Sequence, residues 1–134
     1  MDKLNNLYRE EILEHYRNPQ NFGKLDLYDT SSKQLNPFCG DEIEMFVKCE
    51  LISAGVDMKS PRGCRIIDIS FFGKGCAISI AAASILTDYV KGKTKSQLTK
   101  FLEKDMLDLL GVNISETRKK CALLALAVLK DCIK

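Results

Sequence analysis

Hydrophobic and polar positions alternate most regularly over residues 42–52. Apolar side chains recur there at every second position, with mostly charged residues between them, which is typical of a half-buried β-strand. A second strand is predicted over residues 65–72, where Ile67, Ile69 and Phe71 share one face. These two strands predict a hairpin.

Helical spacing predicts most of the remaining structure. Residues 4–17 form an amphipathic pattern that ends at Asn18-Pro19, whereas residues 76–91 are apolar nearly all round and predict a buried central helix. Three further helices are expected after it: one opened by the capping box Thr94-Lys95-Ser96-Gln97, one over 104–110 and one over about 116–132.

The order helix, strands, helices indicates an α+β fold. We expect a small antiparallel sheet of three strands, the third being a short strand near residues 33–35, with the helices packed mainly on one face. Residues 53–63 contain two glycines and a proline and predict a long hairpin loop. We expect one domain over residues 1–134.

Composition and charge exclude several classes of protein. The 134 residues are 46% hydrophobic and 28% charged, with a net charge of +2. This balance is typical of a globular protein and does not favour an extensive nucleic-acid surface. The N-terminus lacks the apolar stretch of a signal peptide, and no apolar run is long enough to span a membrane. We therefore expect a cytoplasmic protein that binds neither nucleic acid nor membrane.

Six cysteines are present, and no two of them form a C-x-x-C pair, so a zinc ribbon is not supported. Because cytosolic thiols stay reduced, a disulfide framework is not expected either. Cys49 falls on the apolar face of its predicted strand and is interpreted as a small hydrophobic core residue. Cys64 is interpreted as incidental, without a partner nearby in the sequence. The lone His15 is interpreted as a packing or capping residue rather than a ligand.

The remaining cysteines suggest a metal site centred on the turn that contains Cys39 and Asp41. Cys76 follows two glycines at a predicted helix start, and Cys121 follows three basic residues, and both settings favour a thiolate. Three thiolates and a carboxylate suit zinc or an iron–sulfur cluster. Cys132 is excluded because 11 residues of helix place it about 16 Å from Cys121. These residues alone leave scattered structural cysteines open as the alternative.

Several segments resemble motifs of the NifU N-terminal domain/IscU/SufU family of iron–sulfur cluster assembly proteins, in that family's order and over nearly the whole chain. The segments are Asn36-Pro37-Phe38-Cys39-Gly40-Asp41, Gly73-Lys74-Gly75-Cys76-Ala77-Ile78-Ser79, Arg118-Lys119-Lys120-Cys121-Ala122-Leu123-Leu124, His15-Tyr16-Arg17-Asn18-Pro19-Gln20-Asn21-Phe22-Gly23 and Lys91-Gly92-Lys93.

The resemblance implies a scaffold protein and leaves open whether the chain also acts as a sulfurtransferase-like acceptor. Such a scaffold takes sulfur from a cysteine desulfurase and iron from a donor, and passes the assembled cluster to apo-proteins. The implied ligands are Cys39, Asp41, Cys76 and Cys121. They would hold zinc or an iron–sulfur cluster, the 2Fe–2S type being expected first. Cys121 and Cys39 are the candidate persulfide acceptors, because an acceptor needs thiolate character and access.

Two branches of the family remain as alternatives. The IscU branch carries a histidine before the third cysteine, whereas this chain has Lys120, and Arg118 and Lys120 resemble the SufU branch of zinc-bound sulfur relays. The chain is nevertheless too short between Cys76 and Cys121 for the SufU insertion. A zinc-bound sulfur acceptor for a desulfurase is therefore the alternative to the scaffold. A binding module with a structural zinc is a second alternative.

Overall fold

The computed structural model describes residues 2–37, 40–51, 64–111 and 113–133. Within them the chain forms three strands and five helices. In chain order these are α1 (Asp2–Arg17), β1 (Thr30–Asn36), β2 (Asp41–Leu51), β3 (Cys64–Lys74), α2 (Ala77–Val90), α3 (Lys95–Thr99), α4 (Glu103–Leu110) and α5 (Glu116–Cys132).

β2 is the central strand of an antiparallel sheet with the order β1-β2-β3. Asn36 at the end of β1 pairs with Asp41 at the start of β2, and Glu42 pairs with Lys74 at the end of β3. Because α2 begins only three residues after Lys74, the β1–β2 turn and the start of α2 lie at the same end of the sheet.

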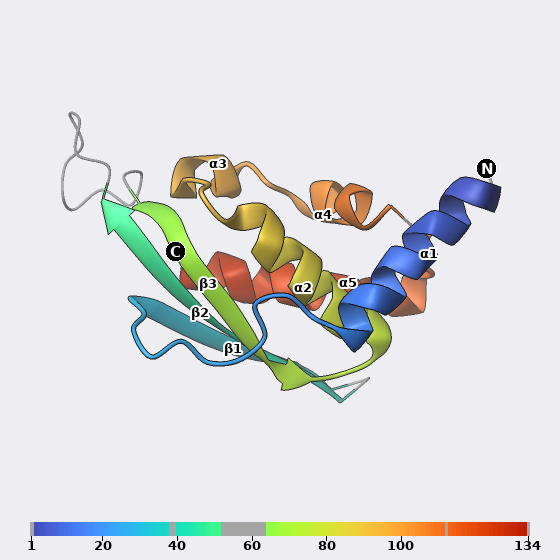
Figure 1. Ribbon diagram of the computed structural model, residues 1–134, viewed down its shortest axis with the longest axis horizontal. Coiled ribbons are helices and arrows are strands. Elements are labelled where there is room, and N and C mark those ends of the chain that lie inside the picture. Colours follow the sequence, from blue (N-terminus) through green and yellow to red (C-terminus); the bar gives the residue numbers. More distant parts are fainter. Residues whose placement is uncertain (1, 38–39, 52–63, 112, 134) are drawn as a thin grey trace.

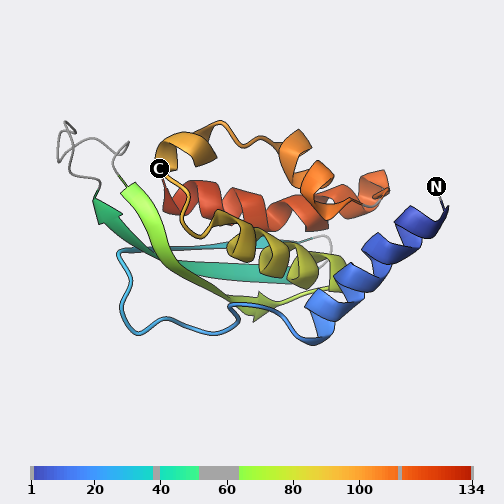
Figure 2. The same ribbon diagram turned by 45° about the horizontal axis from the view of Figure 1, so that its top comes forward.

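The helices are segregated on one face of the sheet (Figures 1 and 2). α2 and α5 pack against the strands, α4 packs against both of these helices, and α1 packs against α2. This arrangement confirms the predicted α+β fold and its three-stranded sheet. The capping box predicted at Thr94 is also present, since the Thr94 hydroxyl accepts a hydrogen bond from the Gln97 N–H at the start of α3.

α2 is the buried centre of the helical layer, as its apolar sequence predicted. Ala81, Ala82, Ala83 and Leu86 have no solvent exposure. Short alanine side chains reduce the distance at which neighbouring helices can pack. In the described part of the chain, no helix has both the length and the apolar character needed to cross a membrane.

Both faces of β2 carry buried side chains. Ile43, Met45 and Val47 are fully buried beneath the helices, in agreement with the alternation in the sequence. Phe46, which the same alternation places on the polar face, is only 5% exposed. The ring of Tyr28 covers it in an edge-to-face contact with 5.0 Å between the ring centroids. The segment before β1 therefore shields part of the outer face of the sheet.

The predicted inner face of β3 is wrong at one position. Ile69 and Phe71 are buried as expected, but Ile67 is 45% exposed and Ile66 is fully buried instead. The reason is a β-bulge: Lys48 pairs with Asp68 and the next residue of β2, Cys49, pairs with Ile66. The extra residue on β3 reverses which side chains face the core from that point outward.

The interpretation of Cys49 and Cys64 as unrelated free cysteines is also wrong, because the two form a disulfide. They are separated by 15 residues in sequence, but their Cα atoms lie 5.6 Å apart. Antiparallel pairing places Cys49 opposite Ile66, two residues from Cys64. The hairpin thus supplies the partner that is missing from the local sequence, at the end of β2 remote from Asp41.

Candidate metal centre

Cys76 occupies the N-cap position of α2, where the backbone is extended, and its side chain is partly exposed. Gly75 precedes it and allows a close approach to the β1–β2 turn. A Cβ atom at position 75 would lie 2.7 Å from the Asp41 Oδ1 atom, closer than such atoms pack. Gly75 therefore leaves the space that the Asp41 carboxylate occupies.

Asp41 is the first residue of β2 and is 1% exposed. Its Oδ1 atom accepts a hydrogen bond of 2.9 Å from the Cys76 backbone N–H, and its Oδ2 atom accepts one of 2.6 Å from the Ser79 hydroxyl. Both oxygens thus bind the first turn of α2, whose N–H groups favour a negative charge. Each oxygen has a second lone pair, so these bonds leave capacity for a metal ion.

Cys121 lies in the second turn of α5 and is fully buried. The side-chain amide of Asn36, the last residue of β1, donates a hydrogen bond to the Cys121 sulfur at 3.9 Å. Asn36 is itself buried and pairs with Asp41 across the sheet. The end of β1 therefore links the cysteine on α5 to the carboxylate on β2.

One carboxylate oxygen of Asp41 and the sulfur atoms of Cys76 and Cys121 all lie within 4.8 Å of one another. This separation is compatible with three ligands around one metal ion or one edge of a cluster. Two sulfur donors and one oxygen favour a soft or borderline metal such as zinc or iron, rather than magnesium or calcium. The arrangement provides three candidate ligands from three different elements.

The surroundings of Cys76 favour its thiolate form. Partial burial alone raises the pKa of this thiol, and the Asp41 carboxylate raises it further. Hydrogen bonds that Cys76 forms with the side chain and backbone of Ser79 and with Cys121 outweigh both effects, and the pKa of Cys76 falls below its usual value. The Ser79 Oγ atom lies 3.5 Å from the Cys76 sulfur. A lowered pKa favours metal binding, since the thiolate is the ligand.

Other residues weighed as ligands are placed as follows. Cys39 lies outside the described residues. Cys132 is buried away from the three candidate ligands and its thiol donates to the Met45 carbonyl oxygen at 3.8 Å. His15 Nδ1 lies 2.7 Å from the Ser84 hydroxyl oxygen. Among the described residues, His15 does not belong to the cluster of Asp41, Cys76 and Cys121.

Ser79 and Asn36 form hydrogen bonds with the candidate ligands, and the sequence analysis did not identify either of them as a functional residue. Ser79 follows Cys76 by three residues, the spacing at which a first-turn side chain can reach back to the start of its helix. That signal was available from the sequence. The contact of Asn36 with Cys121 spans 85 residues and could only be found from the fold.

Comparison with known families gives one match that covers residues 7–134, to the family described as NifU-like N terminal domain. Among curated relatives, the iron-sulfur cluster assembly scaffold protein IscU 1 of Archaeoglobus fulgidus is 30% identical over 127 residues, which cover 95% of this chain and 74% of that protein. The zinc-dependent sulfurtransferase SufU of Bacillus subtilis is 38% identical over 91 residues, covering 67% of this chain and 52% of that protein.

Solved structures include the same fold. A crystal structure described as a putative iron-sulfur cluster assembly scaffold protein for the SUF system, from Fervidobacterium islandicum, superimposes with a TM-score of 0.75. The match covers 93% of this chain and 95% of that chain at 24% sequence identity. At this identity the likeness supports the fold.

Proposed function

Since the chain belongs to the family of NifU-like N-terminal domains, we propose that it is an iron–sulfur cluster assembly scaffold. The observation that carries the proposal is the convergence of Asp41, Cys76 and Cys121, whose ligand atoms lie within 4.8 Å of one another. A cluster site needs ligands that share one centre while coming from segments that can separate when the cluster leaves. Here β2, the start of α2 and α5 each contribute one ligand.

The proposed ligand set is Cys39, Asp41, Cys76 and Cys121. Three thiolates match the preference of iron–sulfur clusters and zinc for soft donors, and the carboxylate is a harder donor that a recipient thiol can displace. The cluster is cargo in this reading, with a 2Fe–2S cluster as the expected form. Zinc would occupy the same four residues and hold the thiolates in their ionised state.

Sulfur enters by transfer from a cysteine desulfurase. The acceptor thiolate attacks the terminal sulfur of the desulfurase persulfide, the sulfur–sulfur bond breaks, and the desulfurase cysteine leaves as a thiolate. Cys39 and Cys121 are the proposed acceptors. Because the Cys121 side chain is fully buried, it accepts sulfur only after a movement that exposes it. An iron donor and apo-proteins that receive the cluster complete the proposed set of partners.

A zinc-bound sulfur acceptor is the second candidate function. Arg118, Lys119 and Lys120 precede Cys121, and this basic start of α5 resembles the SufU branch. In that reading the zinc ligands are the same, sulfur passes from the desulfurase through one of the cysteines to a further acceptor, and no cluster is built. The two functions share a site and differ in the product that leaves it.

Anaerobic reconstitution distinguishes them. The protein, a cysteine desulfurase and cysteine are incubated without ferrous iron, and with ferrous iron plus dithiothreitol, which supplies the electrons that reduce the persulfide sulfur to sulfide. Visible spectroscopy, metal analysis and mass spectrometry of the intact protein follow. A scaffold develops cluster absorption and binds iron and sulfide. A zinc-bound acceptor gains a persulfide, retains zinc and develops no cluster absorption.

Cys132→Ser is the matched control, since it removes a buried thiol that lies away from Asp41, Cys76 and Cys121. The control should behave as the unmodified protein, whereas Cys76→Ser should lose cluster and zinc. If the protein gains neither persulfide nor cluster, and removing zinc unfolds it, the site is a structural zinc and both transfer functions are wrong.

A further inference from the structure

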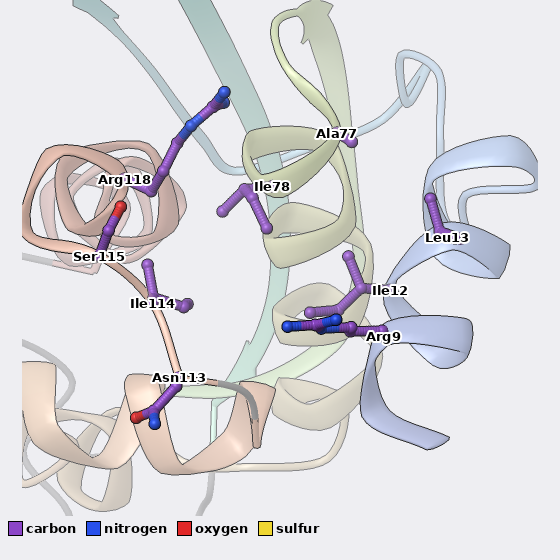
Figure 3. Close-up of a pocket in the computed structure, with 9 residues that line it drawn as sticks. All are labelled: Arg9, Ile12, Leu13, Ala77, Ile78, Asn113, Ile114, Ser115 and Arg118. Atoms are coloured by element: carbon purple, nitrogen blue, oxygen red, sulfur yellow. The ribbon is translucent and has the colours of Figure 1, made fainter. Parts of the chain in front are cut away.

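A cavity of about 430 Å³ lies beside the metal centre, between three elements of the helical layer. α1 contributes Ile12 and Leu13, α2 contributes Ile78, and the segment before α5 contributes Ile114. Figure 3 shows Ile12, Ile78 and Ile114 around a common space between α1, α2 and α5, with Leu13 farther out on α1. The walls are therefore largely aliphatic, as in sites that take an apolar group.

Two arginines border this apolar space, Arg9 from α1 and Arg118 from α5. In Figure 3 the Arg9 side chain extends from α1 toward the side of the cavity where Ile114 lies. Both arginines are exposed, and within the described residues neither guanidinium forms an ion pair or hydrogen bond. Guanidinium groups bind carboxylates with good geometry, so the cavity is complementary to an apolar group with an adjacent negative charge.

The cavity continues toward the metal centre on one side. Ala77 lines it and directly follows Cys76, and Arg118 precedes Cys121 by three residues, less than one helical turn. An occupant of the cavity would therefore lie next to two of the candidate ligands without displacing them.

On its other side the cavity continues along α1. Leu13 and Tyr16 are 42% and 44% exposed and follow Arg9 at helical spacing on one face. Leu13 and Tyr16 extend the apolar surface past the cavity toward the C-terminal end of α1, which favours a protein segment over a small molecule as the occupant.

We infer that this cavity, lined by Ile12, Leu13, Ile78 and Ile114 and bordered by Arg9 and Arg118, holds an apolar side chain and a neighbouring carboxylate of a protein partner. We identify that partner as a protein that exchanges sulfur or a cluster at the adjacent centre, and this identification rests on the proposed function. The binding preference for an acidic and apolar segment does not rest on it.

Binding is tested by NMR on the zinc-loaded, ¹⁵N-labelled protein with two model peptides, acetyl-Glu-Leu-Phe-Glu-amide and acetyl-Lys-Leu-Phe-Lys-amide. The acidic peptide should shift the amide signals of Ile12, Ile78 and Ile114, and the basic peptide should bind at least about tenfold more weakly, because of the charge-assisted contacts to the arginines. Arg9→Glu should reduce affinity for the acidic peptide by a similar factor. Lys100→Glu, a charge reversal at an exposed site after α3 that lines neither the cavity nor the adjoining face of α1, should leave it unchanged.

Transfer is tested with the same variants. Arg9→Glu should raise the KM for a cysteine desulfurase or for an apo-ferredoxin, while cluster formation from ferrous iron and inorganic sulfide stays unchanged. Failure of the inorganic reconstitution in the unmodified protein would refute the proposed function and leave the peptide result standing. Equal binding of both peptides, binding of hexanoate as tightly as the acidic peptide, or self-association of the protein through this face would overturn the inference.

Discussion

Asp41 combines two roles in the structure, and substitutions can separate them. Its two oxygens accept hydrogen bonds from the Cys76 N–H and the Ser79 hydroxyl, and one oxygen also belongs to the candidate ligand group. Asp41→Ala leaves the Cys76 N–H without its acceptor, while the Ser79 hydroxyl can turn to the Cys76 sulfur 3.5 Å away. Losing one buried acceptor and one charge-assisted bond should lower the free energy of unfolding by about 2 kcal/mol.

Asp41→Asn should be milder for stability. The amide oxygen can keep the Cys76 N–H bond, and the amide nitrogen can donate to the Ser79 oxygen, so both groups stay paired and only the charge is lost. We expect a decrease of about 1 kcal/mol. Both variants lose the anionic ligand, and both should bind zinc more weakly than the unmodified protein. The two variants should therefore differ in their free energy of unfolding, whereas both should show weakened zinc binding.

Urea unfolding of the metal-free protein and competition with a zinc chelator measure the two effects. If Asp41→Asn binds zinc as tightly as the unmodified protein, Asp41 only caps α2 and its role as a ligand is wrong. If Asp41→Ala is as stable as the unmodified protein, the hydrogen bonds to α2 do not contribute as described.

Asp41→Cys supplies a fourth thiolate and should retain a cluster longer and transfer it to an apo-ferredoxin more slowly. Transfer half-times equal to those of the unmodified protein would refute the lability argument.

Three further results are expected. Reducing the Cys49–Cys64 disulfide should lower the free energy of unfolding by about 3 kcal/mol, the usual value for a loop of this length, with no change in metal stoichiometry; Cys49→Ser should lack this response to reductant. Cys132 should resist iodoacetamide at pH 8 in the folded protein and react in urea, because burial, together with the nearby Asp131, raises the pKa of its thiol to about 12; rapid labelling of the folded protein would contradict this. Gly75→Ala should weaken zinc binding while the circular dichroism spectrum is retained, because the added Cβ displaces the Asp41 carboxylate; unchanged zinc affinity would show that the contact is not needed.

Local patterns in the sequence predicted most of the fold. The apolar composition of α2, the capping box at Thr94 and the alternation in β2 each depend on neighbours within a few residues, and the structure agrees with all three. The prediction was wrong at Ile66 and Ile67, where a β-bulge reverses the faces of β3. A bulge changes pairing between strands, and nothing in the period of one strand reveals it.

The candidate site was predicted unevenly for the same reason. The turn before Asp41 and the helix starts near Cys76 and Cys121 are local features, and the structure places these three residues together. The disulfide between Cys49 and Cys64 was missed because both lie in a hairpin whose register cannot be read from either strand alone. The general expectation of reduced cytosolic thiols then favoured the wrong interpretation.

The central claim is most directly tested by metal and sulfide analysis of four single Cys→Ser variants after anaerobic reconstitution with a cysteine desulfurase, cysteine, ferrous iron and dithiothreitol as the reductant. We predict that variants of Cys39, Cys76 and Cys121 lose the visible cluster absorption and most of the bound iron, while Cys132→Ser retains both at the level of the unmodified protein. A folded Cys76→Ser or Cys121→Ser variant that binds a full complement of iron and sulfide would contradict the account.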